Sequence, residues 1–190
     1  METNLLVAGF GGQGIMMLGK LIAFAACDNS EKKVTFFPSY GAEQRGGTAN
    51  CYVVISDNEI GEPVSEKVDD LIVMNGPSLS RFLSNLKPGG NLFINSTIVQ
   101  DEIERSDINI IKAPVMDISL EMGNSKVLNI VMLGVYVGYT NILPTEDVEK
   151  SIIDILRKKA DLILLNKEAF SRGFAIGENE AKQHLLLKQS

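Results

Sequence analysis

Residues 3–14 read TNLLVAGFGGQG, a short apolar run that ends in a cluster of glycines. Gly9, Gly11 and Gly14 stand at the spacing G-x-G-x-x-G, and Gly12 adds a fourth glycine. Apolar residues at helical spacing follow at once. We therefore predict a buried strand over residues 3–9, a glycine turn, and a helix over residues 13–27. This order of elements is what makes such a glycine motif informative.

The chemistry of this turn favours a phosphate or diphosphate ligand. Glycines let the backbone turn sharply and let a bulky group approach it closely. The helix that follows directs unpaired N–H groups and a partial positive charge at the turn. The alternative is a tight turn whose glycines serve packing alone. Four glycines within six residues exceed what packing requires, so we favour a ligand site at Gly9, Gly11, Gly12 and Gly14.

The composition is that of an ordinary globular protein in which residues 1–190 form a single domain. A net charge of −6 argues against a nucleic-acid partner, and the short cationic run at residues 157–159 is expected to be solvated. No apolar run is long enough to span a membrane, and we expect no leader segment. Cys27 and Cys51 lack metal-site spacing, which favours two buried thiols and a cytoplasmic location.

Further strands and helices alternate along the chain. We predict strands at residues 34–37, 49–56, 69–74, 91–95 and 108–111, and helices near residues 77–86, 125–140, 145–160 and 162–172, with a hairpin after residue 49. This pattern indicates an α/β fold of the Rossmann-like, doubly wound type. It has a mostly parallel sheet, helices on both faces and a helical C-terminal third. Gly134 and Gly138 suit close packing, either on the sheet or in a subunit interface.

The predicted strands end in Gly9, Pro38, Asn75 and Asn95, which should share one edge of the sheet. Ligands of doubly wound folds bind at this edge. Asn75 and Asn95 are therefore either site residues or simple turn and cap residues. A nicotinamide site would need an acidic residue about 20 positions after the glycines, whereas Pro38 ends the second predicted strand. This absence argues against NAD.

A second glycine-rich stretch, residues 38–48, reads PSYGAEQRGGT and is predicted to be a loop. Arg45 could bind a carboxylate or phosphate through two hydrogen bonds. It could equally form a weak surface pair with Glu43. The residues alone favour neither role of Arg45 over the other.

The sequence lacks the usual catalytic sets. His184 is the only histidine and lies far from both glycine-rich stretches. We find no Ser-His-Asp set, no Walker lysine, no C-x-x-C pair and no cluster of metal ligands. The pattern is typical of a binding domain whose partner performs the chemistry.

At residues 9–14 and 39–47 the sequence resembles the gamma subunit of 2-oxoacid:ferredoxin oxidoreductases, and the run SYGAEQRGG is the more specific of the two signatures. The resemblance implies a non-catalytic subunit of a complex that oxidises a 2-oxoacid, with 2-oxoglutarate favoured, and coenzyme A to acyl-CoA. It implies coenzyme A contacts at Gly9, Gly11, Gly12, Gln13 and Gly14, and at Arg45.

The resemblance also implies partners. Thiamine diphosphate and iron–sulfur clusters are expected in alpha and beta subunits, with a delta subunit as an option, and ferredoxin is expected to accept the electrons. A homodimer is a further option. Two other hypotheses remain: a stand-alone NAD(P)-dependent oxidoreductase, which the end of the strand at Pro38 disfavours, and a nucleotide-sensing module without an enzyme partner.

Overall fold

The structure, a computed structural model, describes residues 1–28, 32–40 and 48–187. Its strands are β1 (Glu2–Phe10), β2 (Lys33–Tyr40), β3 (Thr48–Ser56), β4 (Val68–Val73), β5 (Leu86–Asn95) and β6 (Asn109–Ala113). Its α-helices are α1 (Ile15–Asp28), α2 (Gly76–Phe82), α3 (Val115–Glu121), α4 (Leu128–Thr140), α5 (Thr145–Leu156) and α6 (Ile163–Leu187), with short 3₁₀ turns at Leu83–Asn85, Ser125–Val127 and Ala160–Leu162.

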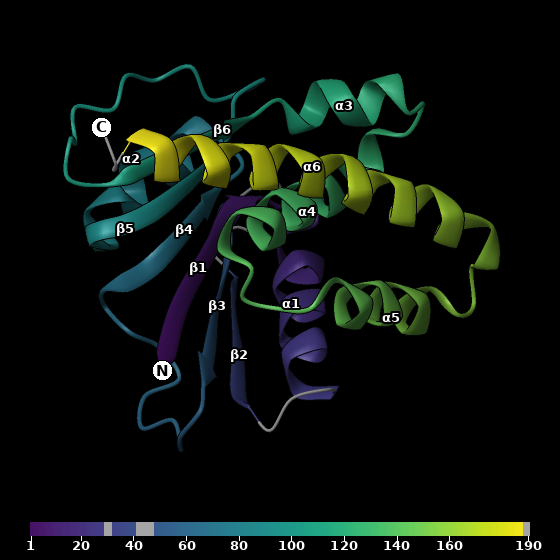
Figure 1. Ribbon diagram of the computed structural model, residues 1–190, viewed down its shortest axis with the longest axis horizontal. Helices are drawn as coiled ribbons and strands as arrows, with labels where there is room; N and C mark the ends of the chain where they lie inside the picture. The colour runs from purple at the N-terminus through teal and green to yellow at the C-terminus, as the bar shows by residue number, and fades with distance from the viewer. Residues whose placement is uncertain (29–31, 41–47, 188–190) are drawn as a thin grey trace.

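The six strands form one mixed sheet in the order β2-β3-β1-β4-β5-β6 (Figure 1). Strands β1, β4, β5 and β6 run parallel, whereas β3 is antiparallel to both of its neighbours. The predicted α/β class with a mostly parallel sheet is thus confirmed. The hairpin is misplaced in the prediction. It lies before β3, between β2 and β3, and residues 59–61 form no strand.

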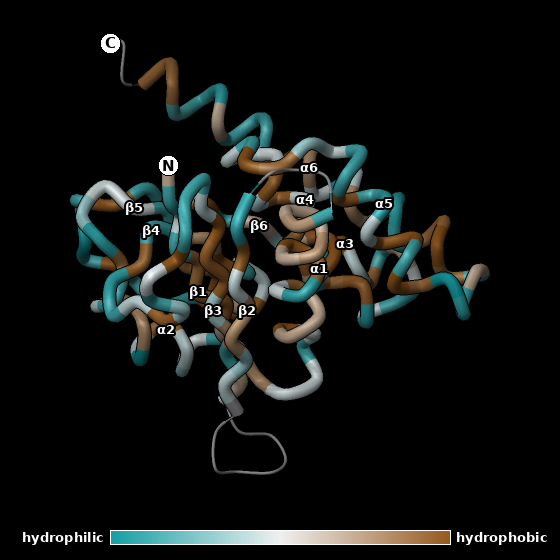
Figure 2. Tube along the Cα trace, turned by 90° about the horizontal axis from the view of Figure 1, so that it is seen from below, coloured by the Kyte–Doolittle hydropathy of each residue, from teal (hydrophilic) through white to brown (hydrophobic). Residues whose placement is uncertain are grey.

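Helices cover the two faces of the sheet unequally. The larger core lies where α1, α4 and α6 pack on one face, around Leu5, Val7 and Phe93. The smaller core lies on the other face, where α2 and the loop after β5 cover Leu6 and Ala8. Strand β1 is therefore buried on both faces and paired on both sides, which explains its unbroken apolar run (Figure 2).

Helices α4 and α6 pack against each other through four glycines. A Cβ atom on Gly134 or Gly138 of α4 would collide with the backbone at Phe170 or Phe174 of α6. Gly173 and Gly177 of α6 face the α4 backbone in the same way. The prediction of packing on the sheet or at a subunit interface is wrong for these glycines, because their partner is a helix of the same chain.

Two predicted strand boundaries are also wrong, both at prolines. Pro38 lies inside β2, opposite Cys51, because β2 is an edge strand whose outer side needs no N–H donor. Residues 87–90, which the prediction left between the helix near 77–86 and the strand at 91–95, form the first half of β5, and the pairing of β4 with β5 shifts register there. Gly89 takes a positive φ of 77° within this irregular segment.

Cys27 and Cys51 differ in their surroundings. Cys51 is buried under α1, as expected, and burial raises its pKa to about 12. Cys27 is exposed in the last turn of α1, where it lines a shallow open hollow with Phe24 of α1 and with Val34 and Phe36 of the edge strand β2. The prediction of two buried thiols therefore holds only for Cys51.

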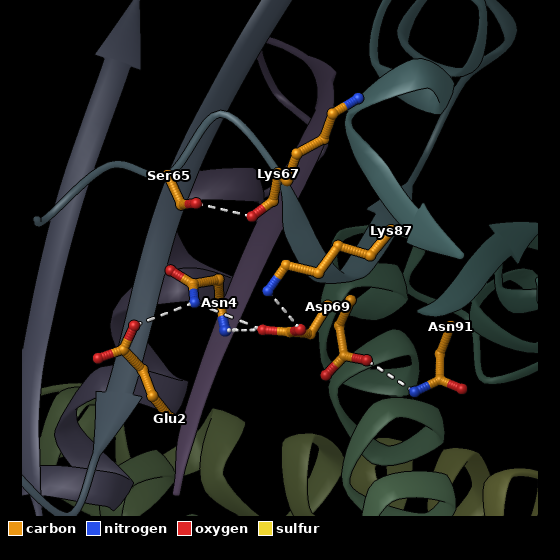
Figure 3. A network of polar contacts seen from close by, with 8 residues as sticks. Glu2, Asn4, Ser65, Lys67, Asp69, Lys87 and Asn91 are labelled. Atoms are coloured by element: carbon orange, nitrogen blue, oxygen red, sulfur yellow. Dashed lines mark hydrogen bonds and ion pairs between the residues drawn. The ribbon is translucent and has the colours of Figure 1, made fainter. Parts of the chain in front are cut away.

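A polar cluster occupies the edge where the parallel strands begin (Figure 3). Asp69 accepts hydrogen bonds from the Asn4 backbone N–H at 2.8 Å and from the Lys87 ammonium group at 2.7 Å. Asp70, only 3% exposed, accepts from Asn91 Nδ2 at 2.7 Å and from the Tyr136 hydroxyl at 3.0 Å. Burial raises the pKa of Asp70 to about 6. This cluster joins α4 to the sheet at the edge opposite the glycine turn.

Candidate functional site

The glycine turn connects the end of β1 to the start of α1. Gly12 and Gly14 take positive φ angles of 97° and 73°, which favour glycine. Gly11 and Gly12 are exposed, and an added Cβ atom at either position would meet nothing within 4 Å. The turn therefore presents bare backbone to solvent on one side.

Gly9 and Gly14 face inward and pack closely. A Cβ atom on Gly9 would lie 2.6 Å from the Ile15 side chain, and one on Gly14 would lie 2.6 Å from the Asn129 amide. Asn129 of α4 also donates to the Gly14 carbonyl at 3.3 Å. Part of the glycine motif thus serves packing, and Gly11 and Gly12 are the positions open to a ligand.

Gln13 fixes the turn to the neighbouring strand end. Its Oε1 accepts from the Phe10 N–H at 2.7 Å and from Asn75 Nδ2 at 3.2 Å, and its Nε2 donates to the Met74 carbonyl at 3.1 Å. The side chain of Gln13 is therefore committed to the ends of β1 and β4. Its contact with coenzyme A stays a prediction that concerns its backbone more than its side chain.

Asn75 is the N-cap residue of α2, which is the second of the two roles predicted for it. Its Oδ1 accepts from the Ser78 N–H at 2.9 Å at the start of α2, and its Nδ2 supports Gln13. Asn95 differs, because it is fully buried and neither amide atom has a partner in the part of the chain that the structure describes. Neither side chain is exposed to a ligand.

A pocket of about 280 Å³ opens beside the turn. Gly12 and Gly14 form one wall, and helices α1, α4, α5 and α6 form the others. Lys126 and Lys159 line the pocket, and neither ammonium group forms an ion pair in the described ranges 1–28, 32–40 and 48–187. The sequence gives no local signal for these lysines, because only the packing of α4 and α5 brings them to the turn.

The start of α1 adds polar donors to this pocket. The first intrahelical bond of α1 runs from Leu18 N–H to the Gly14 carbonyl at 2.9 Å. The N–H groups before Leu18 have no acceptor within the helix, as at any helix start. These N–H groups and the two lysines provide positive charge density around an apolar hollow that includes Met17 and Ile130.

The second glycine-rich stretch emerges beside the first. Gly9 pairs with Ala49, and Ala49 pairs with Tyr40 on its other side, so both stems of the hairpin end at the edge of the glycine turn. Thr48, opposite Phe10, accepts a hydrogen bond from Arg81 at 3.0 Å. Arg45 and Glu43 lie outside the described residues, so the role of Arg45 stays a prediction.

The inserted strand changes the argument about NAD. The nucleotide-binding order places a second parallel strand next to the first, with its acidic residue beside the glycines. Here β3 lies between β1 and β2 and runs antiparallel to both. The end of β2 is thus one strand further from the glycine turn than in a nicotinamide site. The strand order therefore argues against NAD more strongly than the missing acidic residue at Pro38 does.

Residues 4–176 match the protein family described as pyruvate ferredoxin/flavodoxin oxidoreductase. The chain belongs to this family. The match covers the glycine turn, the hairpin and helices α1 to α5, so the pocket and all of the sheet except the first two residues of β1 lie within the family domain. The resemblance noted at the two glycine-rich stretches is confirmed.

Relatives within the family include chains of two lengths. The 2-oxoglutarate synthase subunit KorC of Methanocaldococcus jannaschii is 34% identical over 180 residues, which cover 94% of this chain and 95% of KorC. The ketoisovalerate oxidoreductase subunit VorA of Methanothermobacter marburgensis is 37% identical over 134 residues, which cover 70% of this chain but only 28% of VorA. The chain therefore matches nearly the full length of this KorC subunit but spans only 28% of VorA.

Solved structures of family members share the fold. The gamma subunit of the keto/oxoacid ferredoxin oxidoreductase from Geobacter sulfurreducens superposes with a TM-score of 0.84 at 27% identity, over 95% of this chain and 98% of that one. The 2-oxoglutarate:ferredoxin oxidoreductase from Magnetococcus marinus, solved with 2-oxoglutarate, coenzyme A and succinyl-CoA bound, gives a TM-score of 0.86 at 24% identity, over 94% of this chain and 31% of that one. The second likeness shows the fold alone.

In the segments that the structure describes, no helix is both long and apolar enough to cross a membrane. The same segments hold no group of three or more His, Cys, Asp or Glu side chains placed to bind a metal ion.

Proposed function

We propose that this chain is the gamma subunit of a 2-oxoacid:ferredoxin oxidoreductase and that its glycine turn helps to hold coenzyme A. The observation that carries the proposal is the pocket at Gly12 and Gly14, where open backbone, the start of α1 and two lysines converge in a member of this family. The diphosphate of coenzyme A is the kind of anion that such a turn accommodates.

The residues present fit this ligand. Exposed backbone at Gly11 and Gly12 lets a diphosphate approach the N–H groups at the start of α1. Lys126 and Lys159 are placed to pair with phosphate oxygens, and Met17 and Ile130 offer apolar contact to the uncharged parts of the molecule. In this role the chain's own residues bind and orient the ligand, and they bring no acid or base to the reaction.

Substrate and partners follow from the relatives. We favour 2-oxoglutarate, since KorC matches this chain over nearly its whole length. The complex would then include alpha and beta subunits that carry thiamine diphosphate and iron–sulfur clusters, would pass electrons to ferredoxin and would work in the cytoplasm. Residues 1–190 would act as one gamma-type domain.

The test uses the assembled complex and two kinds of variant. A Cβ atom at Gly11 would meet no atom of the described chain within 4 Å, so the effect of Gly11→Val is expected to fall on the ligand rather than on folding. The double variant Lys126→Ala/Lys159→Ala removes two phosphate partners. We expect the lysine double variant to raise the KM for coenzyme A about tenfold or more, because a charge-assisted contact contributes about 1.5–3 kcal/mol. We expect Gly11→Val to raise the KM as well, because its side chain would block the approach of the diphosphate to the turn. The turnover number at saturating coenzyme A should stay near that of the wild type.

Lys182→Ala serves as the matched control, since Lys182 is an exposed cation on α6, paired with Glu178 and outside the pocket. An unchanged KM for coenzyme A in both test variants would disprove the assigned binding site. Purification of the tagged chain from its host would test the subunit assignment separately. The absence of larger companion subunits would contradict that assignment.

A further inference from the structure

A second groove lies between α1 and α5, next to the pocket at the glycine turn. It encloses about 760 Å³. Helix α1 contributes Lys20 and Phe24, and the end of α5 with the residues after it contributes Arg157, Lys158 and Lys159. Met17, Ile155, Leu156 and Lys159 line both hollows, so the groove adjoins the pocket.

The groove is cationic in a chain whose net charge is −6. Four cations line it against two carboxylates, those of Asp28 and Asp154. Within the ranges that the structure describes, none of the four cations forms an ion pair. Cations after a helix end complement the helix dipole, which explains residues 157–159 but not Lys20, which lies in the middle of α1.

An aromatic ring and a hydroxyl group accompany these charges. Phe24 is 43% exposed, and the Lys20 ammonium group lies 5.4 Å from the centre of its ring. Ser151 of α5 also lines the groove, and its buried hydroxyl has no hydrogen-bond partner in the described part of the chain. An exposed ring beside unpaired cations is the combination that stacks a flat base while holding its phosphate.

We propose that this groove binds a nucleoside phosphate, with the base against Phe24 and the phosphate on Lys20, Arg157 and Lys158. The proposal rests on the groove itself, and only the assignment to coenzyme A, given below, rests on the proposed function. The same chemistry could come from two sources. One is a free nucleotide, and the other is the nucleotide end of a coenzyme A molecule whose diphosphate lies at the adjoining glycine turn.

The test is calorimetric titration of the full chain with AMP, adenosine and inorganic phosphate. AMP should bind about tenfold or more tightly than either fragment, because it joins both contacts in one molecule. Phe24→Ala should weaken AMP binding about tenfold without changing phosphate binding, whereas Lys158→Ala should weaken both. Both side chains are exposed, so the variants should fold. Leu164→Ala and Lys182→Ala control for the loss of an exposed apolar and an exposed cationic side chain elsewhere.

Titration with coenzyme A separates the two sources. If Lys158→Ala weakens coenzyme A and AMP equally, the groove holds the nucleotide end of coenzyme A. If only AMP is weakened, the groove holds a free nucleotide. AMP that binds no more tightly than phosphate would overturn the proposal. The proposal would also be overturned if Lys158→Ala bound AMP as tightly as the wild type while Gly11→Val lost AMP binding. That result would assign the nucleotide to the glycine turn alone.

Discussion

Replacement of Asp70 by Asn should stabilise the protein at neutral pH. Asp70 lies between β4 and α4, 3% exposed, and its carboxylate accepts one hydrogen bond from Asn91 and one from Tyr136. Burial disfavours the charged form and raises the pKa from its ordinary value of 3.8 to about 6. An Asn side chain keeps the shape, accepts from Asn91 and can donate to the Tyr136 oxygen.

The size of the effect follows from the pKa. The raised pKa means that the folded protein holds the proton of Asp70 more tightly than the unfolded chain does. The stability that this neutral carboxyl group contributes is fully present below about pH 4 and is lost as the pH rises through about 6. Each pKa unit corresponds to about 1.4 kcal/mol, so the difference between 3.8 and about 6 corresponds to about 3 kcal/mol. The Asn variant should therefore gain up to about 3 kcal/mol on the wild type between pH 4 and pH 7.

Urea unfolding of both proteins, followed by far-UV circular dichroism at several pH values from 4 to 7.5, measures this difference. In thermal unfolding near pH 7, the Tm of the variant should be roughly 6–12 °C higher than that of the wild type, because each kcal/mol corresponds to about 2–4 °C in a chain of this size. Asp161→Asn removes an exposed carboxylate and controls for the change in net charge. A stability difference that does not vary with pH would refute burial as the cause.

Three further changes test other parts of the structure. Gly14→Ala should lower the free energy of unfolding by about 2 kcal/mol or more, measured in urea, because the added methyl group meets the facing amide at a positive φ; Gly11→Ala, in open space, is the matched control with little change. Gly173→Ala should cost about 3 kcal/mol or more in the same assay, since its Cβ would collide with the α4 backbone, and a stable variant would contradict the described helix packing. Under native conditions a disulfide-exchange reagent should modify Cys27 rapidly and Cys51 only on unfolding; equal rates would contradict the burial of Cys51.

Elements whose structure depends on neighbouring residues in the sequence were predicted correctly from local patterns. The glycine turn, β1 and α1 were predictable because residues 3–14 combine an apolar run, glycines at fixed spacing and a helix start. The order of strands was not predictable in the same way. Nothing in residues 48–56 indicates that β3 inserts between β1 and β2, since a strand buried on both faces reads the same in either direction.

The rest of the candidate site depends on contacts between distant segments. Lys126 and Lys159 reach the glycine turn only through the packing of α4 and α5 against α1, and each alone reads as an ordinary surface lysine. Pro38 misled the strand prediction because its effect depends on whether the strand is central or at an edge. The short run at residues 157–159 became significant only when the fold placed Lys20 beside it.

The three hydrogen bonds of Gln13 have a consequence for the kinetics of binding. They hold the turn between β1 and α1 in its final shape before any anion arrives, and they tie it to the strand that is paired on both sides at the centre of the sheet. A ligand at this turn then loses little conformational entropy on ordering the loop. Its affinity is therefore expressed chiefly in a slow rate of release.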